Sequence, residues 1–308
     1  MTFTELRYIV ALAQEQHFGR AAERCHVSQP TLSVGVKKLE DELGVLIFER
    51  SKNAVRLTPV GEGIVTQAQK VLEQAQGIRD LAQTGRNQLI TPLRVGAIYT
   101  VGPYLFPHLI PRLHSIAPDM PLYIEENFTH VLREKLRTGE LDAILIALPF
   151  QEADVLTKVL YEEPFCVLMP AEHAWTALSS IDSNLLNDRS LLLLGEGHCF
   201  RDQVLEACPT HRRGDDSHRH TTVQSSSLET IRHMVASGLG VSVLPISAVT
   251  SRHYPPGLLE TRPISPHTPS RSVAIAWRAS FPRPKAIDVL VDAVQSCAKT
   301  HMLNSQTE

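Results

Sequence analysis

The most reactive side chains in this sequence are its cysteine thiols. The five stand at Cys25, Cys166, Cys199, Cys208 and Cys297. A cysteine reacts as its thiolate, which basic neighbours or a helix N-terminus favour. Cys199 has His198 before it and Arg201 two positions after it, and a helix starting near Cys199 would add the positive end of its dipole. Cys199 is therefore the candidate reactive thiol, with Cys208 nine positions away as its possible partner.

The residues alone leave several interpretations of these cysteines open. Cys25, Cys166 and Cys297 lie in helix or strand patterns and fit the common role of small buried hydrophobes, and Cys199 and Cys208 could play the same role. Alternatively, Cys199 and His198 could be the nucleophile and base of a thiol peroxidase or hydrolase, although adjacent residues seldom form such a pair. The odd, sparse set is not a disulfide framework and fits a reducing cytosol.

A second cluster with possible chemistry is the segment HRRGDDSHRH, residues 211–220. Its candidate metal ligands are His211, His218, His220, Asp215 and Asp216. Its density of glycine and charge is more typical of an exposed loop. We therefore expect no metal and no cofactor.

Length and composition predict a soluble protein of two or three domains. The chain has 308 residues, of which 43% are hydrophobic and 20% are charged. Its formal net charge of −3 argues against binding of polyanions by bulk electrostatics, so any nucleic-acid site must be local. No apolar run approaches the ~18 residues of a membrane span. We expect a cytoplasmic protein without a membrane partner.

Residues 1–58 show three short helical patterns followed by a hairpin. Apolar spacing predicts helices over residues 4–15 and 18–25. Ser28 is a good N-cap and Pro30 falls in the first turn, so a third helix begins there and ends before Gly44. Apolar runs at residues 45–48 and 54–57 flank a basic tip. This order predicts a winged helix-turn-helix.

The outer face of the third helix and the hairpin tip carry side chains suited to DNA. The short polar side chains of the third helix can reach base edges, and Val34 can contact a thymine methyl group. Lys37 and Lys38 can reach phosphates. A merely solvated face is the alternative, since acidic residues follow at 40–42. The candidate DNA-binding residues are Ser28, Gln29, Pro30, Thr31, Ser33, Val34, Lys37, Arg50, Lys52 and Arg56.

Residues 59–88 read as one long helix that links two domains. Apolar residues recur at alternating steps of four and three, as in the seam of a coiled coil. The alternative is a helix that covers its own domain, but a linker is expected to have no core of its own to cover. We therefore expect dimerisation, which suits a reader of two half-sites. The predicted seam consists of Ile64, Ala68, Val71, Ala75, Ile78 and Ala82.

Residues 89–308 alternate strand and helix patterns, which predicts an α/β domain with a buried, largely parallel sheet. Strands are expected at 93–98, 122–126, 141–148, 165–169, 191–194, 241–244 and 273–277, and helices at 105–116, 129–137 and 285–299. The pattern indicates two blocks of strands and helices, and the chain returns to the first block after completing the second. We therefore expect two lobes with a cleft, lobe I at about 93–160 and 268–300 and lobe II at about 161–267.

The chain resembles LysR-type transcriptional regulators over essentially its whole length. The resemblance lies in FGRAAERCHVSQPTLSVGVKKLEDELGVLIFERS followed by LTPVGEG, and in the later segments TGELDAILIAL and GLGVSVLP. It implies a winged helix-turn-helix, a linker-helix coiled coil and a two-lobed effector domain like periplasmic binding proteins. In that family the assembly is usually a dimer of dimers.

A narrower resemblance joins GEGHCFRDQVLEAC, residues 195–208, to the redox segment of the peroxide-sensing members of that family. It implies that Cys199 reacts with hydrogen peroxide and that Cys208 closes a disulfide with it. GAIYTVGPYLFP and NFTH are similar to the same members. The residues that the resemblance places at the peroxide pocket are Thr100, Thr129, His198, Arg201 and Asp202.

The leading hypothesis is a peroxide-responsive transcription factor and not an enzyme, switched by a Cys199 to Cys208 disulfide. Its implied partners are double-stranded promoter DNA, further copies of itself, RNA polymerase, and a thiol reductant such as glutaredoxin or thioredoxin. If nine residues of helix separated the cysteines they would lie about 13.5 Å apart, and a disulfide would force local refolding. The alternative is a regulator that senses a metabolite between its lobes, with incidental cysteines.

Overall fold

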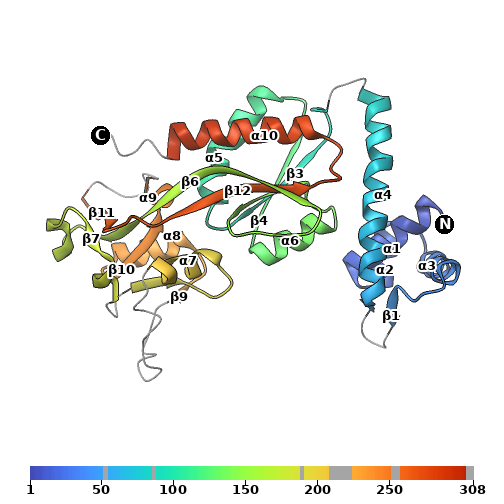
Figure 1. Ribbon diagram of the computed structural model, residues 1–308, viewed down its shortest axis with the longest axis horizontal. Coiled ribbons are helices and arrows are strands. Elements are labelled where there is room, and N and C mark those ends of the chain that lie inside the picture. The colour runs from blue at the N-terminus through green and yellow to red at the C-terminus, as the bar shows by residue number, and fades with distance from the viewer. Residues whose placement is uncertain (51–54, 85–87, 188–190, 208–223, 251–256, 303–308) are drawn as a thin grey trace.

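The computed structural model describes residues 1–50, 55–84, 88–187, 191–207, 224–250 and 257–302 (Figure 1). A small helical head at the N-terminus leads into one long helix, and a larger α/β body follows. Among the described residues, no helix is both long and apolar enough to cross a membrane.

The head contains the three predicted helices around its own apolar core. They are α1 (Phe3–Glu15), α2 (Phe18–Arg24) and α3 (Gln29–Leu43). Ser28 caps α3 by accepting a hydrogen bond from the amide of Thr31. Gly44 ends α3 with φ of 69°, a left-handed conformation that glycine adopts without strain. The start and end of the third helix are confirmed.

The wing is held to the head by a buried carboxylate. Strands β1 (Phe48–Arg50) and β2 (Val55–Leu57) pair antiparallel, as the hairpin pattern predicted. Glu40, on α3, accepts hydrogen bonds from the amides of Ile47 at 2.9 Å and Phe48 at 3.0 Å. This acidic residue, which seemed to weaken the case for DNA binding, has a structural task inside the head.

The linker helix α4 (Pro59–Thr84) does not have the free apolar seam that the sequence suggested. Ile64, Ala68 and Val71 pack against the core of the head, and Ala68 is only 3% exposed. The expectation that a linker has no core of its own to cover is therefore wrong for the first half of α4. Ile78, further along the helix, is 69% exposed. The side chain of Ala82 lies outside the described residues.

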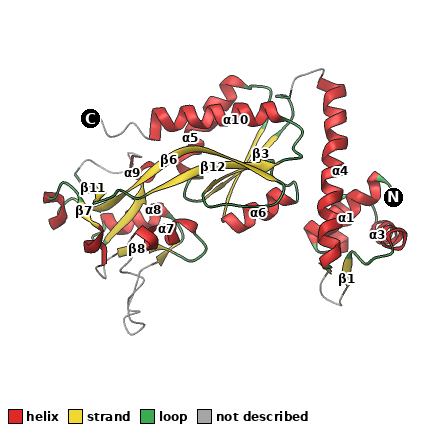
Figure 2. Cartoon of the chain, in the orientation of Figure 1, coloured by secondary structure: helices red, strands yellow, loops and turns green. Residues whose placement is uncertain are grey.

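Lobe I of the body is built on three parallel strands. These are β3 (Leu93–Ile98), β4 (Leu122–Asn127) and β5 (Ala143–Ala147), in the order β4-β3-β5. Helices α5 (Gly102–Ile116) and α6 (Thr129–Arg137) connect them, and α10 (Pro284–Cys297), which packs along α5, is followed by a π-helical turn, Ala298–Met302 (Figure 2).

Two long strands join lobe I to lobe II, and they correct the expected parallel sheet. β6 (Val155–Pro170) and β12 (Ser270–Arg278) run antiparallel to each other, and β12 is antiparallel to β5. The sheet is mixed because β12 is the returning strand of the chain. Only the second half of β6 was predicted, since its first half is mostly exposed and carries charges instead of an apolar run.

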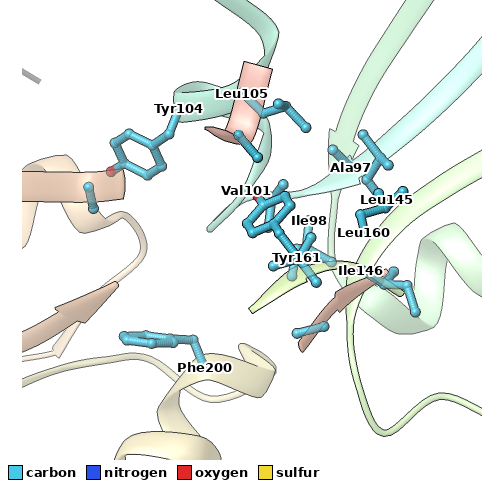
Figure 3. Close-up of a cluster of buried hydrophobic side chains, with 14 of the residues drawn as sticks. Ala97, Ile98, Val101, Tyr104, Leu105, Leu145, Ile146, Leu160, Tyr161 and Phe200 are labelled. Atoms are coloured by element: carbon cyan, nitrogen blue, oxygen red, sulfur yellow. The ribbon is translucent and has the colours of Figure 1, made fainter. Parts of the chain in front are cut away.

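Lobe II continues the same strand order as β6-β10-β8-β9. Its strands are β7 (Ile181–Asp182), β8 (Leu191–Leu194), β9 (Gln224–Ser225), β10 (Val241–Pro245) and β11 (Leu259–Ser265), its helices α7 (Cys199–Ala207), α8 (Leu228–Ala236) and α9 (Ile246–Thr250), and its 3-10 turns Ala174–Ala177 and Ser183–Asn187. One apolar cluster runs through both lobes (Figure 3).

Candidate functional site

The structure brings three loops together where lobe I meets lobe II. Thr100 follows β3, Thr129 is the first residue of α6 after β4, and Cys199 is the first residue of α7 after β8. Each loop leaves the carboxyl end of a parallel strand, the edge at which open α/β sheets bind ligands. The sequence expectation of a helix starting near Cys199 is confirmed, and the helix dipole there favours an anion.

A cluster of tilted and edge-on aromatic rings holds the three loops together. The ring centroids of Phe128 and His198 lie 4.8 Å apart, and those of Tyr99 and Phe128 lie 5.2 Å apart. Gly197 has φ of 91°, and a Cβ on it would lie 3.4 Å from the ring of Phe128. The left-handed backbone at Gly197 therefore requires glycine, and this turn aims His198 at lobe I.

His198 is the polar member of this aromatic cluster and is almost fully buried. Burial lowers its pKa, because the protonated ring loses its hydration among the aromatic side chains. His198 is accordingly neutral at neutral pH. Of the two roles expected of it, a positive or a polarising neighbour of Cys199, the lowered pKa favours the polarising one, through a hydrogen bond.

Cys199 and the other residues expected near it differ in their exposure and in their contacts. Cys199 itself is half-buried and packs against the core of the body. The guanidinium of Arg201 donates a hydrogen bond to the carbonyl oxygen of Leu194 at 2.8 Å, which fastens α7 to β8. Asp202, on α7, is exposed, and its place at the peroxide pocket stays a prediction.

Arg271, which the sequence analysis missed, connects the Thr100 loop with α7 and β6. Its Nη1 donates to Thr100 Oγ1 at 2.8 Å, its Nη2 to the Thr100 carbonyl at 2.8 Å and its Nε to Glu163 at 2.7 Å. Its guanidinium also lies over the ring of Phe200, 5.2 Å from the centroid. The one available signal was a charged residue at the start of an otherwise apolar strand pattern.

Further contacts close the boundary between the lobes around α7. The hydroxyl of Tyr104 donates to Glu229 at 2.9 Å, and Gln203 Nε2 donates to the carbonyl of Leu148 at 3.1 Å. Phe200 points from α7 into the shared core, edge-on to Phe165 at 5.0 Å (Figure 3). Side chains of lobe I and lobe II therefore already bond one another where a cleft was expected.

The outer face of α3 is exposed, as DNA contact requires. Val34 is 68% exposed and Lys37 is also exposed, whereas Lys38 Nζ is bonded to the carboxylate of Glu5 at 2.9 Å. Lys38 is thus paired with Glu5 within the head, although its side chain is 65% exposed. Of the remaining candidates, Ser28, Gln29, Pro30, Thr31 and Arg56 are exposed and Ser33 is half-buried.

Some predicted residues lie outside the described part of the chain. They are Cys208, Lys52, residues 211–220 of the weak metal hypothesis, and the side chain of Arg50. Among the described residues, no group of three or more histidines, cysteines, aspartates or glutamates could hold a metal ion.

Comparison with known families matches both parts of this architecture. The family model described as "Bacterial regulatory helix-turn-helix protein, lysR family" matches residues 3–62, and the one described as "LysR substrate binding domain" matches residues 86–298. The chain belongs to the LysR family of transcriptional regulators. As a LysR-type regulator it contains a DNA-binding head and a two-lobed regulatory body.

Several characterised relatives of this LysR-type regulator have names that mention peroxide or OxyR. The DNA-binding transcriptional dual regulator OxyR of Escherichia coli K12 is 37% identical over 301 residues, which cover 98% of this chain and 97% of the relative. A solved full-length mutant OxyR from Pseudomonas aeruginosa is 80% identical over 97% of this chain and 96% of its own, with a TM-score of 0.84. An H₂O₂-bound mutant OxyR of Corynebacterium glutamicum is 32% identical over 98% and 94%, with a TM-score of 0.66.

The lowered pKa of His198 predicts a specific pH dependence of stability. Because the folded state holds the ring neutral, the unfolded chain binds one proton more below the usual histidine pKa of about 6.5. The stability that neutral burial provides is present above that pH and is lost as pH falls. Urea unfolding between pH 8 and 5 should show a weaker pH dependence in His198→Gln than in the unsubstituted chain.

The control for this experiment is His114→Gln, which removes an exposed histidine from α5. This variant should keep the pH dependence of the unsubstituted chain. Identical pH profiles for His198→Gln and His114→Gln would contradict the assignment of a buried, neutral His198.

Proposed function

We propose that this chain is a peroxide-sensing regulator of transcription whose sensor is Cys199. The observation that carries the proposal is the position of Cys199 at the N-terminus of α7, directly after His198, whose ring packs on Phe128 and Tyr99 of the two lobe I loops. Relatives named as hydrogen peroxide-inducible genes activators support the same function.

The sensing chemistry is a two-electron oxidation of one thiol, followed by condensation with another. The Cys199 thiolate attacks one oxygen of hydrogen peroxide, the O–O bond breaks, and hydroxide leaves and takes up a proton to form water. The Cys199 sulfenic acid then reacts with the Cys208 thiol, which forms the disulfide and releases a second water. Thr100 and Thr129 are proposed to hold the peroxide, with neutral His198 as a hydrogen-bonding partner.

Closure of that disulfide is incompatible with an intact α7. The nine helical residues from Cys199 to Ala207 rise about 12 Å at 1.5 Å per residue, and Cys208 follows Ala207 directly. Adjacent Cα atoms are about 3.8 Å apart, so a residue bonded directly to the end of an intact α7 cannot bring its Cα within the ~7 Å of Cys199 that a disulfide requires. Oxidation would therefore unwind α7 and withdraw Phe200 from its place beneath Arg271.

The proposed readout is a change in how paired heads meet double-stranded promoter DNA. We place the base-reading face on α3 and the phosphate contacts at Lys37 and the wing, and we assign dimerisation to the exposed half of α4 around Ile78. Activation implies RNA polymerase as a partner, and resetting the disulfide requires a thiol reductant of the glutaredoxin or thioredoxin type. These events are proposed to occur in the cytoplasm.

Two other functions receive less support. A metabolite sensor needs an open site between the lobes, whereas Tyr104 already bonds Glu229, and Gln203 already bonds the Leu148 carbonyl, across that boundary. A thiol peroxidase would use Cys199 with His198 as its base and would turn over many times. The DNA-reading head is needed only for regulation, and we therefore propose a regulator that reacts once and is then reset.

The decisive experiment exploits the unequal tasks of the two cysteines. Cys199→Ser removes the nucleophile, so peroxide should neither oxidise the sensor nor alter the DNase footprint. Cys208→Ser keeps the nucleophile and should still form a sulfenic acid that dimedone traps, but it should form no intramolecular disulfide. Thiol counting and mass-spectrometric mapping measure both outcomes.

Cys166→Ser is the matched control, because burial raises the pKa of the Cys166 thiol to about 12 and keeps it unreactive. That variant should respond to peroxide as the unsubstituted chain does. Equal loss of free thiol and equal footprint change in Cys199→Ser and the unsubstituted chain would refute the sensor assignment.

The DNA interface can be tested by comparing two adjacent lysines on α3. Lys37→Ala should lower affinity for all DNA sequences and flatten the dependence of log K on log salt by about one unit, because it removes one phosphate contact. Lys38→Ala should change the salt slope less, since Lys38 is paired with Glu5. Equal salt slopes for the two variants would contradict this assignment of the face.

The proposed dimer contact can be tested at its most exposed apolar position. Ile78→Asp should weaken self-association, because a carboxylate would be buried without a partner in a coiled-coil seam. Gln67→Asp, at another exposed position of α4, is the control and should sediment as the unsubstituted chain does. An unchanged sedimentation profile for Ile78→Asp would exclude this part of α4 from the dimer.

A further inference from the structure

The linker helix α4 has a polar stripe that faces lobe I, separate from the apolar stripe that covers the head. We call it the docking stripe. Its members are Gln69, Lys70, Glu73, Gln74 and Gly77. It meets three parts of lobe I: the turn at residues 136–141, Asp154 before β6, and the end of β12 with the turn that follows it, residues 278–282.

Glu73 lies at the centre of the docking stripe and is buried. One carboxylate oxygen accepts a hydrogen bond from Arg278 Nε at 2.5 Å and another from Gln69 Nε2 at 3.1 Å. The second oxygen accepts from the hydroxyl of Ser280. The side chains of Glu73 and Arg278 are each only 9% exposed. A buried charge with this many partners has one favourable position, so the pair fixes how α4 lies on lobe I.

Arg278 belongs to lobe I independently of the linker. Its Nη1 donates to the carbonyl oxygens of Leu136 and Leu141, at the two ends of the turn between α6 and β5. Only its Nε is directed to Glu73. Lobe I therefore holds the guanidinium of Arg278 in place without the linker, and α4 supplies the carboxylate of Glu73.

The contacts around this pair are polar and loosely packed. Lys70 bonds Asp154 at 2.6 Å, Gln74 bonds the Ser280 carbonyl at 3.2 Å, and Gln14 of the head bonds the Thr138 carbonyl at 2.7 Å. Crevices of about 280 and 350 Å³ open beside Glu73 and beside Lys70. Such an interface resembles a separable contact between domains, and its geometry depends on the buried pair.

Strand β12 connects this contact to the Cys199 site. Arg271 and Arg278 lie seven residues apart on β12, a distance of about 23 Å in an extended strand. β12 pairs with β6 along this whole length and with β5 from Val273 to Trp277. Arg271 lies over Phe200 at one end, and Arg278 holds Glu73 at the other.

We propose that Glu73 is a positioning residue that locks the DNA-binding head to lobe I, and that through Arg278 and β12 it ties the orientation of the head to the state of the Cys199 segment. The lock stands on the contacts around Glu73. The coupling to Cys199 rests on the proposed peroxide-sensing function, so the two parts are tested separately.

Hydrogen exchange of the reduced full-length protein tests the lock. Glu73→Ala should increase amide exchange severalfold in peptides covering residues 69–77 and 278–282, because the stripe no longer holds the turn. Peptides from β10 in lobe II should keep their protection. Glu62→Gln, which removes an exposed carboxylate from the same helix, is the matched control and should exchange as the unsubstituted chain does.

If Glu73→Ala loses its protection from amide exchange in every peptide, the variant is unfolded, and two milder variants then provide the test. Glu73→Gln keeps the shape of the side chain but removes its charge, and Ser280→Ala removes one donor. Each should raise exchange at the interface only. Unchanged exchange at residues 69–77 and 278–282 in folded Glu73→Gln and Ser280→Ala would overturn the lock.

Peroxide treatment of Glu73→Gln tests the coupling. Cys199 should lose its free thiol within about twofold of the normal rate, while the peroxide-induced footprint change should fall severalfold. A full footprint change in the variant would overturn the coupling. If the unsubstituted chain itself lost no thiol and kept its footprint, the proposed function would fail and the coupling with it, whereas the exchange result would still decide the lock.

Discussion

Arg271 and Glu163 form an ion pair in which neither side chain has any exposed surface. Removing two charges from water costs several kcal/mol per ion unless every polar group is satisfied. Here the guanidinium meets Glu163 and both oxygens of Thr100, while Glu163 also accepts from the amide of Ser247. The residues involved come from β12, β6, the loop after β3 and α9. The packing of the two lobes and the shape of the Cys199 site depend on this cluster.

The position of Arg271 beneath Phe200 makes the site of Cys199 sensitive to the rest of the body. Phe200 is 2% exposed and is the neighbour of Cys199 in α7. Any chemistry that unwinds α7 must remove this ring from between Phe165 and the guanidinium. A modification of the half-buried Cys199 sulfur can in this way alter the packing of the core. A packed core changes between two discrete arrangements of its side chains more readily than it deforms gradually.

The electrostatics of the site come from the N-terminus of α7 together with the charge of Arg201. His198 is held neutral by burial, Arg201 is bound to a carbonyl of β8, and Arg271 is neutralised by Glu163. The helix N-terminus at Cys199 remains as a source of positive potential that needs no charged side chain. A second buried pair, Glu73 with Arg278, performs at the linker what Arg271 and Glu163 perform between the lobes.

Local patterns in the sequence by themselves determined the helices of the head, the wing, most body strands and the start of α7 at Cys199, because caps and apolar periodicity act over a few residues. The resemblance to LysR-type regulators identified the family. Only the tertiary structure decided that Ile64, Ala68 and Val71 cover the head, that Asp202 is exposed and that β12 runs antiparallel to β5 and β6. It also paired Arg271 with Glu163 and Arg278 with Glu73, residues 108 and 205 positions apart in the chain. Such pairs leave no periodic signal, because what makes a buried charge tolerable is a partner that folding brings from elsewhere.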